Sequence, residues 1–260
     1  MKIAITGKGG VGKTTLAGVL ARLYAAEGEN VIAIDADPDA NLASAIGFPP
    51  ELAAQIVPVA QMEDLVEERT GMKPGTIGGY FKMNPKVDDL PDSLSAKWNG
   101  IKLLQMGTIK KGGGGCVCAE SVLIKGLVQY IALQRQEVLI LDMEAGLEHL
   151  GRGTAQGVDV LIVVIEPGSR SVQTAQAIKK LAADLKLKNV MAVGNKIHND
   201  SEKQFVRDHM GDIPVLGFMG YNNDVVEADL RGISPYDLDG KVVEEVTEIK
   251  RELDRRFGNS

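Results

Sequence analysis

The stretch GKGGVGKTT, residues 7–15, decides the fold because it fits the phosphate-binding pattern G-x-x-x-x-G-K-[ST]. The apolar run KIAIT, residues 2–6, comes directly before it, and a helical pattern of apolar residues starts at residue 14. A strand that turns through glycines into a helix is the context that this pattern requires. The sequence therefore predicts a phosphate-binding loop at the start of an α/β fold.

This loop offers several phosphate ligands at once. Backbone N–H groups of the glycine-rich turn and the positive end of the helix attract phosphate oxygens. Lys13 is expected to reach the β- and γ-phosphates of a nucleotide, and the Thr14 hydroxyl is expected to ligate Mg²⁺. The predicted nucleotide-binding residues are Gly9, Gly10, Val11, Gly12, Lys13, Thr14 and Thr15.

Short apolar runs alternate with helical patterns along the rest of the chain. Runs that are apolar on both faces and separated by helices indicate a mostly parallel sheet with helices on both sides. The predicted strands are residues 2–6, 31–35, 101–106, 138–142, 160–166, 190–196 and 213–218. We therefore predict a single α/β domain over residues 1–260, with a sheet of about seven strands. Residues 47–100 hold six of the ten prolines and one predicted helix near 60–70, and we interpret them as an elaboration of this domain.

Composition narrows the classes of function. The net charge of -6 argues against a dedicated nucleic-acid binder. No run of 18 apolar residues exists, and the first residues, MKIAIT, lack the long apolar core of a signal peptide. We therefore expect a cytoplasmic protein with no nucleic-acid or membrane partner.

Carboxylates follow two of the predicted strands. Asp35 and Asp37 lie in IDADPDANL, residues 34–42, and Asp142 ends the apolar run VLILD. Residues at the carboxyl ends of parallel strands face the ligand crevice of an open sheet. The plainer alternative is that an aspartate caps the next helix. Downstream, Glu144 and His149 are candidates for a general base or a metal ligand, although a structural hydrogen bond is the commoner role for such a histidine.

Lys8 gives the loop the form KGGVGKT, which resembles the deviant Walker A family that includes MinD, ParA and the nitrogenase iron protein. The resemblance implies an ATPase that forms a homodimer on binding ATP, in which Lys8 reaches the partner's nucleotide. It also implies that Asp37 orients the attacking water and that Asp142 holds Mg²⁺ through water, with Asp35 as a further Mg²⁺ or structural partner. Catalysis is therefore expected to rest on Lys8, Lys13 and Asp37.

The nucleotide base is expected near GNKIHND, residues 194–200. The guanine-binding pattern NKxD would need Asp at position 198, but His198 stands there, so adenine is favoured. Asn195 and Lys196 are the predicted contacts, with Asn195 bonding the adenine ring. Relatives make further base contacts from the segment that corresponds to residues 214–230. Many of them carry a proline within this loop, but GFMGYNND, residues 217–224, has none.

The two cysteines of the chain, Cys116 and Cys118, stand behind four glycines in GGGGCVC. Two thiolates do not complete a four-coordinate site. A two-fold dimer would bring two such pairs together into an S₄ site, which suits Zn²⁺, Cu⁺, an iron–sulfur cluster or square-planar Ni²⁺. The plainer alternative is two adjacent thiols at a helix start.

The chain resembles the CooC-type ATPases, which help to insert nickel into carbon monoxide dehydrogenase, over nearly its whole length. The specific motifs are FKMNPKVDD, residues 81–89, and GGGGCVC, residues 112–118. The resemblance implies that Cys116 and Cys118 of two subunits hold one Ni²⁺ or Zn²⁺, and that the client is a nickel enzyme such as carbon monoxide dehydrogenase or acetyl-CoA synthase. Residues 47–100 are a candidate docking region for that client.

Two other functions compete with this one. An electron-transfer ATPase like the nitrogenase iron protein also shares a cluster between subunits, but its cysteines lie far apart in sequence. A MinD- or ParA-like spatial organiser needs a membrane or DNA surface. The final segment, residues 241–260, places Val242, Val246, Ile249, Leu253 and Phe257 on one helical face. That face fits a membrane-surface helix, but packing on the protein's own sheet is the interpretation that we favour.

Overall fold

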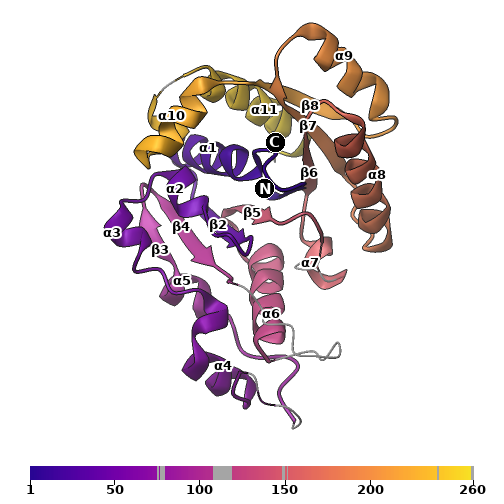
Figure 1. Cartoon of the computed structure of the whole chain (residues 1–260). Helices are drawn as coiled ribbons and strands as arrows, with labels where there is room; N and C mark the ends of the chain where they lie inside the picture. Colours follow the sequence, from indigo (N-terminus) through magenta and orange to yellow (C-terminus); the bar gives the residue numbers. More distant parts are fainter. Residues whose placement is uncertain are drawn as a thin grey trace.

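A mostly parallel β-sheet runs through the centre of the chain, and helices cover both of its faces (Figure 1). The structure, a computed structural model, describes residues 1–74, 76, 80–107, 119–147, 150, 152–238 and 240–258. In spatial order the strands are β3 (Ala96–Trp98), β4 (Ile101–Gln105), β2 (Val31–Ala36), β5 (Val138–Met143), β1 (Lys2–Gly7), β6 (Val160–Ile165), β7 (Val190–Ile197) and β8 (Val215–Gly220).

The predicted fold class is confirmed, and among the described residues the sheet has one strand more than the expected seven. The seven predicted apolar runs correspond to β1, β2 and β4 to β8. The additional strand, β3, has only three residues and pairs antiparallel with β4 at the edge of the sheet. Its residues are only partly buried or exposed, so they form no apolar run that a sequence pattern can reveal.

One layer of helices packs on each face of the sheet, and two clusters of buried apolar residues fill the interfaces. The first face carries α4 (Glu63–Thr70), α6 (Ala119–Gln134), α7 (Arg152–Gln156), α8 (Ser169–Asp184) and α9 (Asp200–His209). The second face carries α1 (Lys13–Ala26), α2 (Leu42–Ile46) and α11 (Lys241–Phe257). The remaining short elements are α3 (Pro50–Ala53), η1 (Val59–Gln61), α5 (Leu90–Leu94), α10 (Asn223–Arg231) and η2 (Pro235–Leu238).

The C-terminal helix α11 packs on the protein's own sheet, as the favoured interpretation predicted. Val242, Val246, Ile249 and Leu253 are at most 1% exposed. A Cβ on Gly217 of β8 would lie 2.7 Å from the Ile249 side chain, so the close approach of helix and strand depends on this glycine. Within the described ranges, no helix has both the length and the apolar character that a membrane span requires.

The middle of residues 47–100 packs on α6, whereas the two ends of the segment, with Phe48 and Trp98, pack in the cluster on the other face of the sheet. Val59, Val66 and Leu90 are buried in the cluster that α6 also enters. A bidentate ion pair between Arg69 and Asp89, with N···O distances of 2.7 and 2.9 Å, joins α4 to the residue before α5. The segment therefore contributes to both faces of the sheet, and in Figure 1 its helix α4 lies beyond the edge of the main body.

Candidate functional site

The glycine-rich loop between β1 and α1 has the conformation of a phosphate cradle. Gly10 and Gly12 have φ angles of 78° and 91°, which residues with a Cβ rarely adopt. The Leu16 N–H donates to the Gly12 carbonyl at 3.1 Å, so helical bonding starts at once after the loop. The free N–H groups of the first helical turn therefore point toward the loop, where they attract an anion.

A hollow of about 780 Å³ opens at this loop and gathers most of the predicted phosphate-binding residues. Its lining includes Gly9, Gly10, Gly12, Lys13, Thr14, Thr15 and Asp37. Val11 points its side chain into the core, where it is 1% exposed. Lys8 is exposed and does not line the hollow, and its contact with the nucleotide of a second subunit stays a prediction.

Lys13 and Asp37 come together across the hollow. The Lys13 side chain is 6% exposed, and its Nζ lies 3.7 Å from an Asp37 carboxylate oxygen. Asp37 comes directly after the end of β2, and this position brings its carboxylate to the lysine of the phosphate loop. A phosphate group that binds Lys13 competes with Asp37 for the same ammonium.

Asp142, at the end of β5, is a buried acid without a hydrogen-bond partner. It is fully buried, and neither carboxylate oxygen has a partner among the described residues. Desolvation raises its pKa to about 6, against the opposing pull of the Thr14 hydroxyl and the Lys13 ammonium. Hard oxygen ligands of this kind suit Mg²⁺. The pair of Thr14 and Asp142 therefore fits the ion that the sequence assigned to it.

Asp35 has a structural task that the sequence left open. Its two oxygens accept the N–H groups of Leu42 at 2.9 Å and of Asp37 at 3.3 Å. It therefore fixes the turn that carries Asp37 and the start of α2. Burial raises its pKa to about 7, and the neighbouring charge of Asp142, opposite it in the strand register, acts in the same direction.

Asn195 and Lys196, the predicted base contacts, both contact the phosphate loop. The Asn195 amide donates to the Val11 carbonyl at 2.7 Å, and the Lys196 ammonium donates to the Gly10 carbonyl at 2.8 Å. Lys196 also pairs with Glu166 at 2.6 Å. Their contact with adenine stays a prediction. Segment 214–230 forms β8 and α10, and Val225, Val226 and Asp229 of α10 line the far wall of the nucleotide hollow.

The sequence did not predict how the turn after β5 is held. Thr6, fully buried in β1, donates to the Glu144 carbonyl at 2.8 Å and so holds the turn after β5. The Gly146 N–H closes that turn by donating to the Glu144 carbonyl at 2.7 Å. The one sequence signal for this contact is Thr6 itself, a hydroxyl residue within the apolar run KIAIT. Cys116, Cys118 and His149 lie outside the described residues, among which no metal-binding cluster occurs.

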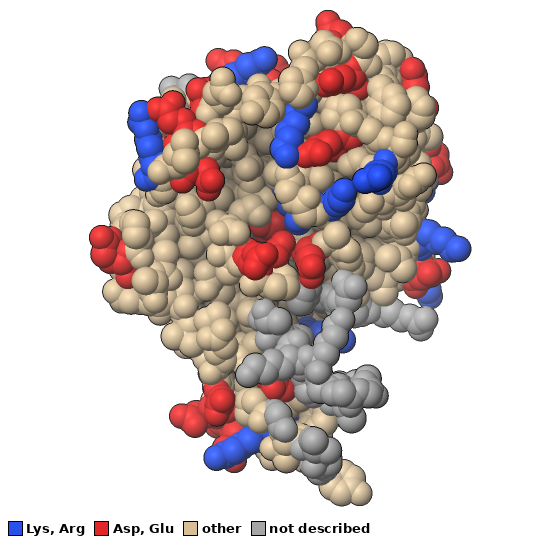
Figure 2. All heavy atoms as spheres, in the orientation of Figure 1, with Lys and Arg blue, Asp and Glu red and all other residues tan. Residues whose placement is uncertain are grey.

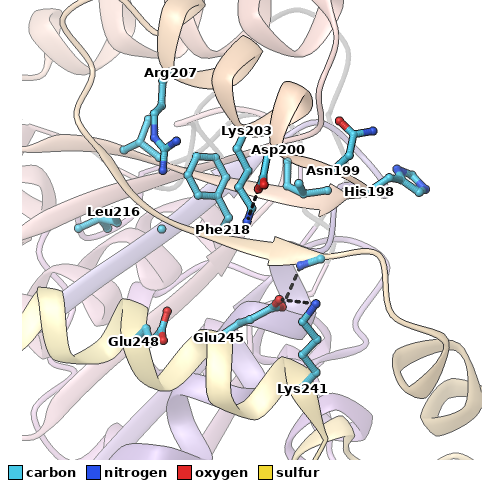
Figure 3. A pocket seen from close by; sticks show the side chains of 14 residues that line it. His198, Asn199, Asp200, Lys203, Arg207, Leu216, Phe218, Lys241, Glu245 and Glu248 are labelled. Atoms are coloured by element: carbon cyan, nitrogen blue, oxygen red, sulfur yellow. Dashed lines mark hydrogen bonds and ion pairs between the residues drawn. The ribbon is translucent and has the colours of Figure 1, made fainter.

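A second hollow, of about 700 Å³, lies at the edge strand β8 between α9 and α11 (Figure 3). Its charged side chains contact one another: Lys203 pairs with Asp200 at 3.0 Å and Lys241 with Glu245 at 3.6 Å. Glu245 also accepts the N–H of Gly220 at 2.8 Å, which covers part of the open strand edge.

On the face shown in Figure 2, described basic and acidic side chains are interspersed rather than gathered by sign.

The glycine loop, its paired lysine and aspartate, and the buried acid on a mostly parallel sheet together define a P-loop ATPase. The chain matches the model of the CobQ/CobB/MinD/ParA nucleotide-binding domain over residues 2–236, and it belongs to that family as an ATPase of the CooC type. It is 49% identical to the carbon monoxide dehydrogenase accessory protein CooC of Rhodospirillum rubrum, over 92% of this chain and 90% of that protein. It is 48% identical to an uncharacterized ATP-binding protein of Methanocaldococcus jannaschii, over 96% of both.

Solved structures of the family share the fold. The MinD of the Aquifex aeolicus MinC:MinD cell division complex superposes with a TM-score of 0.70 at 21% identity, covering 100% of this chain and 97% of that one. A putative plasmid partition protein of Borrelia burgdorferi bound to AMPPNP gives 0.72 at 17% identity, covering 98% and 99%. At these identities the likeness establishes the fold alone.

Proposed function

We propose that this chain is a cytoplasmic, ATP-dependent metallochaperone that delivers nickel to carbon monoxide dehydrogenase. The observation that carries the proposal is the 49% identity, over nine-tenths of both chains, to a carbon monoxide dehydrogenase accessory protein. The pair Cys116 and Cys118 supplies soft ligands of the kind that such a cargo needs.

The ATP cycle in this proposal uses the residues around the first hollow. Lys13 and the loop N–H groups hold the phosphates, and Lys8 of each chain neutralises the partner's nucleotide. Thr14 and Asp142 hold Mg²⁺, which screens the phosphate charge. Asn195 contacts adenine.

Hydrolysis in this proposal is a single in-line displacement. Asp37 accepts a hydrogen bond from a water, whose oxygen forms the new bond to the γ-phosphorus while the bond to the β-phosphate oxygen breaks. ADP and phosphate are the products. Slow turnover is expected, because hydrolysis then serves as a timer for the dimer.

Dimer closure is proposed to bring the cysteine pairs of two chains together around one Ni²⁺ or Zn²⁺. Opening after hydrolysis releases the cargo to a client bound at residues 47–100. Because the ion needs ligands from both chains, its affinity is linked to the nucleotide that closes them.

Metal content of the dimer tests the proposal. Wild type and the Cys116→Ser/Cys118→Ser variant are loaded with Ni²⁺, desalted, and the dimer peak is analysed by mass spectrometry. We expect about half an ion per chain in the wild type and none in the variant. Lys8→Ala, which leaves each cysteine pair intact, is expected to lose the ATP-driven dimer and the shared ion together. Equal nickel in wild type and cysteine variant would overturn the proposal and favour the spatial-organiser class.

A further inference from the structure

Two successive carbonyl groups of the phosphate loop are bonded from outside the loop, by residues at the end of β7. Asn195 Nδ2 donates to the Val11 carbonyl at 2.7 Å, and Lys196 Nζ donates to the Gly10 carbonyl at 2.8 Å. Asn195 is 7% exposed and packs directly under the loop: a Cβ on Gly12 would lie 2.1 Å from its Nδ2. The end of β7 is therefore in close contact with the loop backbone.

These bonds determine where the loop N–H groups point. In a trans peptide the carbonyl and the following N–H point in opposite directions. The bond from Asn195 to the Val11 carbonyl therefore turns the Gly12 N–H to the opposite side of its peptide, and the bond from Lys196 to the Gly10 carbonyl does the same for the Val11 N–H. The Val11 N–H then donates to the Lys8 carbonyl at 3.4 Å, so the peptide that Lys196 holds is the one that closes the turn of the loop. Because Gly10 and Gly12 have little conformational preference of their own, the outside donors select the loop conformation.

Lys196 keeps an unfavourable backbone conformation to make its contact. Its φ angle is +56°, in the left-handed region that a lysine seldom occupies. Asn195 Oδ1 accepts the Lys196 N–H at 2.7 Å, and Glu166, just after β6, pairs with its ammonium at 2.6 Å. Such conformations persist where the surrounding contacts require them, and they gather at functional sites.

We propose that Lys196 is a positioning residue for the phosphate loop and that Glu166 fixes the Lys196 ammonium on the Gly10 carbonyl. In this role the pair determines phosphate affinity and leaves the choice of base unchanged. The inference concerns the ATP site of the proposed function, but it holds whether or not the chain carries nickel.

The test compares affinity for phosphates with selectivity for the base. Dissociation constants for ATP, GTP and inorganic tripolyphosphate are measured with Mg²⁺ by displacement of a fluorescent ATP analogue. For Lys196→Met we expect ATP and tripolyphosphate to weaken by the same factor, about fivefold to tenfold, at an unchanged ATP-to-GTP ratio. Glu166→Gln is expected to give a smaller loss, about twofold to threefold, of the same kind.

Three further variants separate positioning from other effects. Lys203→Met removes a nearby lysine that pairs with Asp200 instead of the loop, and it is expected to change none of the constants. Lys196→Arg restores a cation and is expected to recover most of the affinity. Lys196→Gly relieves the backbone strain but supplies no ammonium, so it is expected to lose as much affinity as Lys196→Met.

Two results would overturn the inference. One is a Lys196→Met protein that folds normally, as judged by its melting temperature, and binds all three ligands like the wild type. The other is a changed ATP-to-GTP ratio with unchanged tripolyphosphate affinity, which would make Lys196 a base contact. Nickel loading of the same variants, at an ATP concentration that saturates each of them, separates these outcomes from a failure of the metallochaperone proposal. At saturation the proposed dimer closes around its cysteine pairs however weakly the loop binds phosphate.

Discussion

Replacing Asp142 by Asn removes a negative charge that destabilises the folded chain, so the variant is expected to be more stable than the wild type at neutral pH and unable to use Mg²⁺. The carboxylate is fully buried and unpartnered among the described residues. Desolvation raises its pKa from the ordinary value of 3.8 to about 6. Asn has nearly the same shape and no charge to desolvate.

The sign and size of the effect follow from the raised pKa. The folded chain binds the Asp142 proton more tightly than the unfolded chain does, so the free energy of unfolding falls as the pH rises from about 4 to about 6. A shift of about two pKa units corresponds to about 3 kcal/mol. The advantage of the variant should therefore be near zero at about pH 4 and reach up to about 3 kcal/mol at about pH 7.

Urea unfolding at several pH values, without nucleotide or Mg²⁺, measures this difference. Asp35→Asn is the matched control, because Asp35 is also buried but accepts two backbone N–H groups, which an Asn amide opposes with its own N–H. Its gain is therefore expected to be smaller or negative. The electrostatic account of Asp142 would be refuted by an Asp142→Asn protein that is less stable than the wild type at pH 7.5, or by an advantage that is the same at pH 4.

Two other variants address the loop and its charged pair. Asp37→Asn removes the counter-ion 3.7 Å from the Lys13 ammonium, so ATP affinity by calorimetry should stay equal or tighten up to about fivefold. Phosphate release by this variant should slow at least about a hundredfold, because Asp37 is expected to orient the attacking water. Unchanged turnover would exclude Asp37 from catalysis. Gly12→Ala places a Cβ 2.1 Å from Asn195 Nδ2 at a φ of 91°, so it should weaken ATP binding at least about tenfold. Gly28→Ala is its control, because Gly28 has a similar φ of 88° but nothing within 4 Å of the added Cβ. This control should cost about 1 kcal/mol of stability and leave ATP binding intact.

Much of the fold could be predicted from the sequence because its strands are buried on both faces. Six consecutive buried residues, as in VLILDM of β5, stand out from any helical pattern. The strand β3 could not be found in this way, since the three residues AKW are held by pairing with β4 and not by burial. The apolar face of α11 could be predicted equally well, because the apolar residues that repeat along the helix are those that pack on the sheet.

The chemistry of the site was less predictable than its location. The glycine pattern places Lys13 and Thr14 by local spacing, and the ends of β2 and β5 place Asp35 and Asp142. The contacts between elements are a different matter: Asn195 and Val11 are 184 positions apart in sequence. Which carbonyl a side chain reaches depends on the order of strands, and no local pattern encodes that order.

The strand order also explains why a bound cation is expected to stabilise the site. Because β5 lies between β2 and β1, it places Asp142 beside Asp35 on one side and the phosphate loop on the other. Burial disfavours the ionised form of both carboxylates, and the charge of Asp142 adds to this effect on Asp35, so the ligand-free site is electrostatically unfavourable at neutral pH. A bound cation with its nucleotide reverses the sign of that field, and a ligand at a hundred times its Kd adds about 2.7 kcal/mol of stability. Binding of Mg·ATP is therefore expected to stabilise the folded chain at the place where the buried acids destabilise it.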